Sequence, residues 1–62
     1  MTKVYVLTRE ENQYDQYGEY FEHVWTKKPS MEDLAAYNPE ITHLGRENYE
    51  DTWYNLHVEN AN

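Results

Sequence analysis

The absence of cysteine from a chain of 62 residues is the feature that most limits how this protein can fold. A chain of this length buries only about 60% of the surface that its unfolded form exposes, and small cores rarely supply more than about 3–5 kcal/mol without disulfides or metals. Because no disulfide can form, packing, a metal or self-association has to stabilise the fold. We expect one small domain over residues 1–62, without a large enclosed cavity.

The hydrophobic pattern predicts three strands. Residues 3–9 are β-branched and aromatic, and apolar and polar residues alternate over 19–27 and 52–59. The polar residues 10–18 end at Gly18 and predict an exposed loop between two antiparallel strands, although part of it could extend them. Residues 60–62 are expected to form a frayed tail.

One short helix is predicted between the second and third strands. Ser30 has the character of an N-cap, and Asp33 follows three residues later, where it completes a capping box. The sequence from Asn38 either ends this helix or begins a second helical turn up to Leu44. The sequence therefore predicts an α+β fold with a three-stranded, mainly antiparallel sheet in the order β-β-α-β. The expected core consists of Val4, Val6, Phe21, Trp25, Leu34, Leu44 and Leu56.

The charge balance is strongly acidic, with 12 Asp and Glu against 5 Lys and Arg and a formal net charge of -7. Direct binding to nucleic acid is not expected, because only Lys27 and Lys28 are adjacent basic residues. A basic protein surface is the favoured partner, although the same charge also keeps a small protein soluble. Disorder is disfavoured by 7 Tyr, 2 Trp and 1 Phe.

No segment has the composition of a signal peptide or of a membrane span. The first residues lead directly into the first predicted strand, and no stretch approaches 18 apolar residues. We therefore expect a cytoplasmic protein that does not bind membranes.

Three short patterns resemble those of small uncharacterised proteins from phages and other mobile elements. They are the opening run Lys3-Val4-Tyr5-Val6-Leu7-Thr8, the helix entry Lys28-Pro29-Ser30, and the closing strand with Val58-Glu59. The resemblance covers mainly the two terminal strands. It implies a compact sheet with one helix and transfers no functional residue, and it favours a role as an inhibitor of a host or defence protein.

The sequence contains no recognisable catalytic site. Cysteine is absent, the only serine is Ser30, which is explained as a helix cap, and the two glycines stand far apart and outside any phosphate-binding motif. Three pairs of adjacent acids occur, but neighbouring strand residues point to opposite faces and acids at a helix start interact with its dipole. We therefore expect a protein that is not an enzyme.

The three histidines, at positions 23, 43 and 57, are the only candidates for metal ligands of the imidazole type. His23 and His57 lie in predicted strands and would be cross-strand neighbours if those strands pair, but their spacing matches no known metal motif. Histidines at the surface or partly buried are the more common case, so no metal or other cofactor is expected.

Acidic and tyrosine residues gather in two stretches that are too polar for a core, residues 10–22 and 47–51. Tyrosine is enriched in interfaces because it supplies a large, rigid contact area. The favoured function is a protein-interaction module, whose sharper form is mimicry of a nucleic acid by carboxylates. The alternatives are rings that only cap a thin sheet, and a structural protein that forms a dimer through a sheet edge. The predicted partner-binding residues are Glu10, Glu11, Tyr14, Asp15, Tyr17, Glu19, Glu22, Glu47, Tyr49, Glu50 and Asp51.

Overall fold

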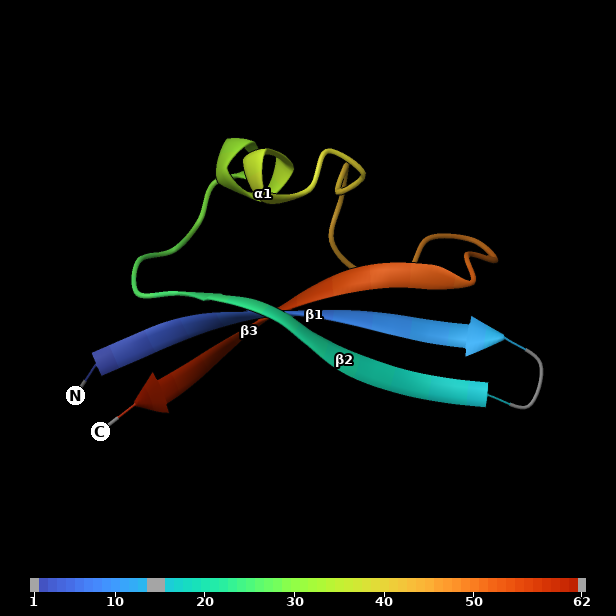
Figure 1. Ribbon diagram of the computed structural model, residues 1–62, viewed down its shortest axis with the longest axis horizontal. Helices are drawn as coiled ribbons and strands as arrows, with labels where there is room; N and C mark the ends of the chain where they lie inside the picture. The colour runs from blue at the N-terminus through green and yellow to red at the C-terminus, as the bar shows by residue number, and fades with distance from the viewer. Residues whose placement is uncertain (1, 14–15, 62) are drawn as a thin grey trace.

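The computed structural model describes residues 2–13 and 16–61, which form three strands and one helix (Figure 1). β1 spans Thr2–Gln13, β2 spans Gln16–Trp25, α1 spans Met31–Tyr37 and β3 spans Thr52–Ala61. The strands form one antiparallel sheet in the order β2-β1-β3, which confirms the predicted fold class. Within the described residues, no helix combines the length and the apolar composition of a membrane span.

β1 is the central strand and pairs with a neighbour along both edges. Its pairing with β2 continues from Tyr5 to Gln13, so the prediction of a loop over residues 10–18 was wrong for most of that segment. Pairing between β1 and β2, joined by β3 at Glu10 and Glu11, overrides the weak strand propensity of these polar residues. The predicted frayed tail was also wrong, because Asn60 and Ala61 pair with Lys3 and Thr2 at the end of β3.

The helix covers one face of the sheet, which we call the helix side (Figure 1). Leu7, at the centre of β1, is fully buried there and forms a core cluster with Leu34 of α1 and Ile41. Trp25, Tyr54 and Leu56 are partly buried and pack against this cluster. The predictions for Leu34, Trp25 and Leu56 are thus confirmed.

Both ends of the helix are fixed by local hydrogen bonds. The Ser30 hydroxyl accepts a bond from the backbone N–H of Asp33 at 3.1 Å, and the Asp33 carboxylate accepts one from the N–H of Ser30 at 2.9 Å. This is the predicted capping box. Asn38 ends the helix, because its N–H donates to the carbonyl of Leu34 and its side chain accepts from the N–H of Glu40. A turn follows, and the alternative of a second helical turn up to Leu44 does not occur.

A bulge in β2 separates aromatic residues that the sequence pattern placed together. Leu7 pairs with His23 and the next residue, Thr8, pairs with Phe21, so Glu22 is an extra residue in β2. His23 and Trp25 therefore lie on the helix side, whereas Phe21 lies on the opposite face and is 66% exposed. The prediction of Phe21 as a core residue was wrong because simple alternation cannot anticipate the extra residue.

The remaining core predictions also fail for geometric reasons. Val4 and Val6 are only partly buried, because the even-numbered residues of β1 point away from the helix while Leu7 points toward it. Leu44 is 38% exposed, because the chain follows a turn and not a helix after Asn38. Ile41 takes its place in the core.

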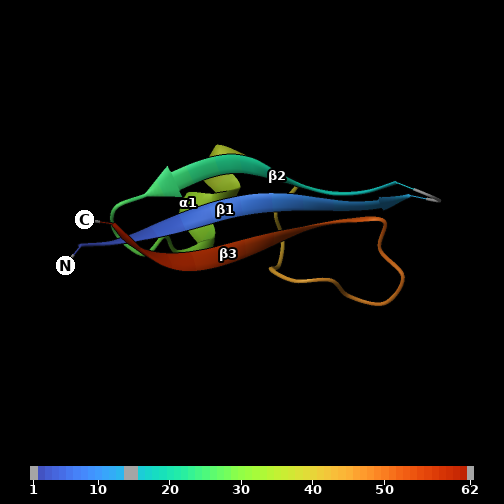
Figure 2. The same ribbon diagram turned by 90° about the horizontal axis from the view of Figure 1, so that it is seen from below.

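The second face of the sheet, which we call the open face, is not covered by any helix or strand of the described residues. Figure 2 shows the sheet from this side, with the three strands in front and α1 behind them. The core cluster of Leu7, Leu34 and Ile41 thus lies on one side only. On the open face Trp53, which pairs with Glu10, is buried, whereas Phe21 and Val24 are exposed.

Leu34→Ala should lower the free energy of unfolding by about 2–5 kcal/mol, because it leaves a cavity between α1 and the sheet. Leu44→Ala is the matched control, since Leu44 is substantially exposed. Chemical denaturation followed by circular dichroism measures both. Equal losses for the two variants would contradict the assignment of Leu34 to the core.

Ser30→Ala should lower the free energy of unfolding by about 0.5–2 kcal/mol, because the N–H of Asp33 loses its partner. Ser30→Thr keeps a hydroxyl at the N-cap and should retain most of the stability. Thermal unfolding of the two variants checks this, and an alanine variant as stable as the parent would show that the cap contributes nothing.

Candidate functional site

The open face presents apolar and acidic side chains together. On β2, Tyr17 is 67% exposed, Phe21 66% and Val24 42%. The strand register places Val6 and Thr8 of β1 opposite Val24 and Phe21, so these side chains share one face. Exposed apolar groups that cluster on one surface are informative, whereas single ones are ordinary.

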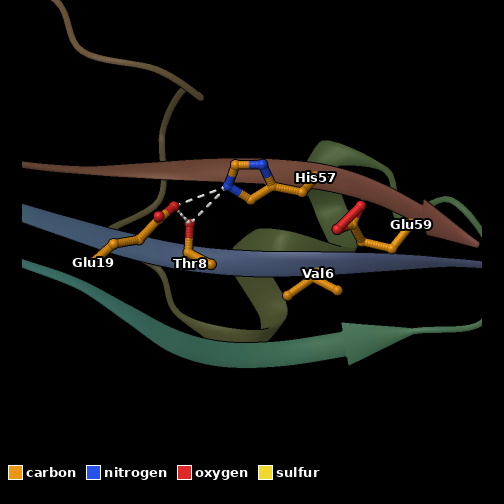
Figure 3. A pocket seen from close by; sticks show the side chains of 5 residues that line it. All are labelled: Val6, Thr8, Glu19, His57 and Glu59. Carbon is orange, nitrogen blue, oxygen red and sulfur yellow. Dashed lines mark hydrogen bonds and ion pairs between the residues drawn. The ribbon is translucent and has the colours of Figure 1, made fainter.

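A hydrogen-bonded group occupies the centre of this face and joins all three strands (Figure 3). The hydroxyl of Thr8 donates to Oε2 of Glu19 at 2.7 Å, and Nε2 of His57 lies 2.9 Å from the same oxygen and 3.2 Å from the hydroxyl. Since the hydroxyl hydrogen goes to Glu19, Nε2 has to carry a hydrogen of its own. The bonds from Thr8 and then His57 lower the pKa of Glu19, which therefore carries negative charge.

This group contains a carboxylate, an imidazole and a hydroxyl, but its geometry differs from that of a catalytic triad. In a triad the acid holds one ring nitrogen of the histidine and the nucleophile contacts the other. Here Glu19 and Thr8 both approach Nε2 of His57. The arrangement orients the side chains and does not activate the hydroxyl as a nucleophile.

Glu10 lies on the same face, two residues after Thr8 along β1. Its carboxylate accepts a bond from the Tyr17 hydroxyl at 3.0 Å and another from the Asn55 amide at 2.8 Å. The bond to Glu10 is also the main cause that raises the pKa of Tyr17. Glu10 and Glu19 are directly opposed across β1 and β2, and these separate donors reduce the repulsion that two facing carboxylates would otherwise produce.

A hollow of about 270 Å³ lies beside the central group, and it is lined by Val6, Thr8, Glu19, His57 and Glu59. Figure 3 shows Glu19 and Glu59 on opposite sides of Val6 along the sheet, with His57 on β3 between them. The hollow thus has an apolar residue at its centre and a carboxylate toward each end.

The described strands place no lysine or arginine on the open face. Their two basic residues, Lys3 and Arg9, occupy odd positions of β1 like Leu7 and so belong to the helix side. There the guanidinium of Arg9 lies 5.4 Å from the ring of Tyr20 and 3.9 Å from Glu22. The charged side chains of the open face, Glu10, Glu19 and Glu59, are therefore acidic.

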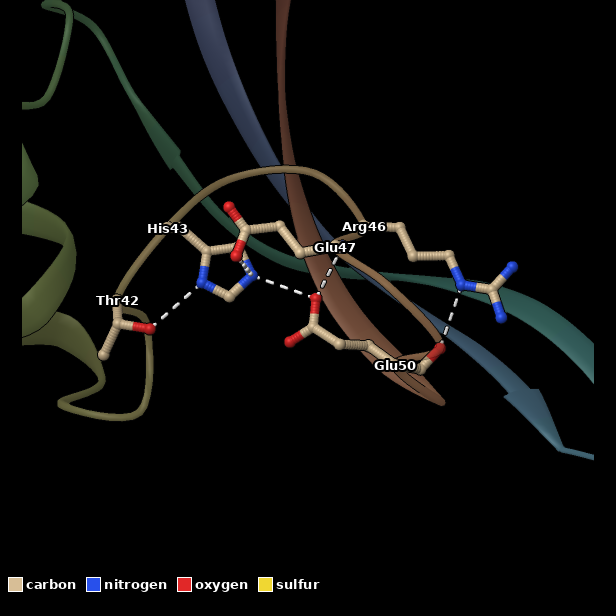
Figure 4. Close-up of polar contacts among 5 residues, drawn as sticks. All are labelled: Thr42, His43, Arg46, Glu47 and Glu50. Carbon is tan, nitrogen blue, oxygen red and sulfur yellow. Dashed lines mark hydrogen bonds and ion pairs between the residues drawn. The ribbon is translucent and has the colours of Figure 1, made fainter.

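A second polar cluster organises the loop before β3 (Figure 4). Nε2 of His43 lies 2.9 Å from Glu50 and 3.8 Å from Glu47, and its Nδ1 lies 3.1 Å from the Thr42 hydroxyl. The hydrogen bond between His43 and Glu50 is the main cause of both pKa changes: it raises the pKa of His43 and lowers the pKa of Glu50. Glu50 also accepts a bond from the N–H of Glu47 at 2.8 Å, so its carboxylate mainly holds the loop together.

Arg46 connects this loop to the third strand. Its Nε donates to the backbone carbonyl of Glu50 at 3.0 Å, and its guanidinium lies 4.9 Å from the ring of Trp53, which is only 8% exposed. Tyr49, at the outside of the loop, is 93% exposed.

The predicted binding residues separate into groups. Glu10, Tyr17 and Glu19 come together on the open face. The carboxylate of Glu22 turns to the helix side, where the Tyr37 hydroxyl donates to it at 3.0 Å. Glu11 occupies a helix-side position of β1, and Tyr14 and Asp15 lie outside the described residues. The rest, Glu47, Tyr49, Glu50 and Asp51, belong to the loop before β3.

Sequence reasoning missed Thr8, Asn55, His57 and Glu59 as parts of this surface. The alternation in 52–59 already placed Asn55 and His57 on the other face of the strand from Leu56. This pattern could have identified them as residues of the exposed surface. His23 and His57 were expected to be neighbours only if their strands pair. This condition is not met, because β1 lies between β2 and β3 and the two histidines occupy opposite faces. Among the described residues, no group of three or more His, Asp or Glu is arranged to hold a metal ion.

Comparisons with protein-family models, with curated proteins and with solved structures gave no match to this chain.

The His43–Glu50 pair should make stability depend on pH. The raised pKa of His43 gives stability that is present below its ordinary value of about 6.5 and is lost as the pH rises through the raised value. The lowered pKa of Glu50 gives stability that is present above about 4.5 and is lost as the pH falls through the lowered value. Both contributions operate together between about pH 4.5 and 6.5.

The difference in melting temperature between the parent and His43→Gln should therefore be largest near pH 5.5 and smaller at pH 3 and pH 8.5, with these pH values taken as rough positions on either side of the window. Thermal unfolding across this range measures it. A difference that stays constant with pH would show that His43 stabilises the loop through packing and not through its charge.

Proposed function

We propose that this chain is a protein-interaction module that binds a basic protein surface with the open face of its sheet. The observation that supports this most is the exposure of Phe21, at 66%, on a face whose charged side chains are acidic. Burying a phenylalanine contributes about 1.5–3 kcal/mol, so a partner that covers it gains affinity. Aromatic residues are also enriched in the interfaces between proteins.

The charge of the module supports a basic partner. The net charge of -7 attracts positive surfaces over several ångströms, and Glu10, Glu19 and Glu59 carry that charge onto the open face. Complementary charge of this kind increases the association rate, whereas the buried aromatic contact determines how slowly the complex dissociates.

Inhibition is the specific form of this proposal. A partner that binds DNA or RNA has a basic surface, and carboxylates at the positions of phosphates would occupy it. Glu10 and Glu19 are held in place by hydrogen bonds, so they present negative charge at defined positions, as mimicry of a nucleic acid requires.

Self-association through the open face is disfavoured by the same charges, because two copies would bring their carboxylates together. The outer edges of β2 and β3 remain candidates for pairing with a second copy. Sedimentation at low and high salt separates the two functions, since a dimer formed through backbone pairing at an edge should persist at either salt concentration.

Phe21→Ala should weaken binding to the partner by about tenfold or more, because Phe21 is the largest exposed hydrocarbon side chain of the open face. Tyr49→Ala is the matched control, since it removes an aromatic ring that is even more exposed than Phe21 but belongs to the loop. Capture from a lysate on the immobilised parent chain, followed by binding measurements with each variant, tests this. The fold of both variants is checked first by circular dichroism.

Binding that survives Phe21→Ala and is lost in Tyr49→Ala would move the functional surface to the loop before β3. Affinity that is the same at low and high salt would argue against a basic partner, because exposed charges are screened beyond roughly 8–10 Å at physiological ionic strength.

A further inference from the structure

The hollow on the open face has the chemistry of a receptor for one cationic side chain. Its volume of about 270 Å³ is below the roughly 300–1,000 Å³ of pockets for drug-sized ligands. Its lining combines the apolar Val6 with the carboxylates of Glu19 and Glu59. We infer that the hollow binds the guanidinium of an arginine carried by the partner, which makes the proposed function more specific and rests on it.

The free hydrogen-bonding capacity of the lining favours a donor that brings several hydrogens. Oε2 of Glu19 is occupied by Thr8 and His57, but Oε1 of Glu19 has no hydrogen bond to another described residue. The carboxylate of Glu59 likewise has no hydrogen-bond partner among the described residues, and Glu59 is exposed. A guanidinium has five N–H donors in a fixed plane and no acceptor, so it can use the free oxygen of either carboxylate.

The apolar part of the hollow favours arginine over lysine. A guanidinium is less strongly hydrated than an ammonium group, and it stacks on aromatic rings. Phe21 lies directly across from Thr8 on the neighbouring strand and is exposed, so the ring is available beside the hollow. The methylene groups of an arginine can contact Val6 while its head reaches the carboxylate at one end of the hollow.

Preorganisation strengthens the site. Thr8 and His57 hold the carboxylate of Glu19 in one orientation, so binding does not have to order it. These contacts also lower its pKa, so that it stays ionised to more acidic pH, where the partner's arginine is charged as well.

The test uses the intact chain and three short peptides of one sequence, in which three positions are all arginine, all lysine or all citrulline. Citrulline has the shape of arginine without its charge. Titrations followed by ¹⁵N–¹H NMR locate each peptide on the chain and give its affinity. The arginine peptide should bind most tightly, and its largest shifts should fall on the amides of Val6, Thr8, Glu19, His57 and Glu59.

Two variants that change the net charge equally distinguish binding in the hollow from attraction to the overall charge of the chain. Glu59→Gln removes a carboxylate from the hollow, whereas Glu40→Gln removes an exposed one near the end of α1. Glu59→Gln should lower the affinity for the arginine peptide by about two- to fivefold, which is the range for an exposed ion pair. Glu40→Gln should lower this affinity less.

Each other outcome overturns a defined part of the inference. Equal affinities for the arginine and lysine peptides, or equal effects of Glu59→Gln and Glu40→Gln, would remove the guanidinium site and leave the open face as a binding surface. Chemical-shift changes that centre on Phe21 and Val24 and leave the residues of the hollow unaffected would likewise remove the guanidinium site and keep the open face as a binding surface. Shifts confined to the helix side or the loop before β3 would overturn the proposed function as well.

Discussion

The extra residue at Glu22 in β2 determines how the sheet divides its side chains between two environments. On one side of this bulge His23 and Trp25 face the helix, where the ring of His23 lies 4.6 Å from that of Trp25 and 5.1 Å from that of Tyr37. On the other side Phe21 faces solvent. The Tyr37 hydroxyl lies 3.2 Å from the backbone carbonyl of Glu22, so the helix itself holds the bulge in place. Without it, the alternation of β2 would bury Phe21, and the open face would lose its main apolar group.

The sequence was sufficient for features that depend on local chemistry. Ser30 with Asp33, and the alternation around Leu56, predicted the helix start and the third strand because caps and strand periodicity act over a few residues. It was not sufficient where a distant partner decides the outcome. The polar residues after Arg9 are part of β1 because β2 pairs with all of them and β3 pairs with the first two. Thr8, Glu19 and His57 meet only through the register of three strands. Tyr17 and Glu19 were identified by composition, whereas the hollow beside them was not.

Because the core cluster lies on one side of the sheet, the other face of this small chain can carry exposed apolar and acidic side chains. Leu7, Leu34 and Ile41 supply the buried centre from three segments, and aromatic residues extend it. The opposite face contributes little to this core and is therefore free to carry Glu10 and Glu19 side by side, provided that neighbouring donors satisfy them. The proposed binding surface and the core cluster thus lie on different faces of the same strands.

The position of β1 between its two neighbours has a consequence for how the chain folds. Its second partner, β3, comes from the far end of the sequence, so that Thr2 pairs with Ala61. Such pairing gives a high contact order, and the entropy of closing the long intervening segment has to be overcome before the ladder forms. During synthesis the hairpin of β1 and β2 emerges first, with one edge of β1 still unpaired. The sheet can therefore be completed only after β3 has emerged from the ribosome, and until then this edge of β1 can pair with another chain and favour aggregation.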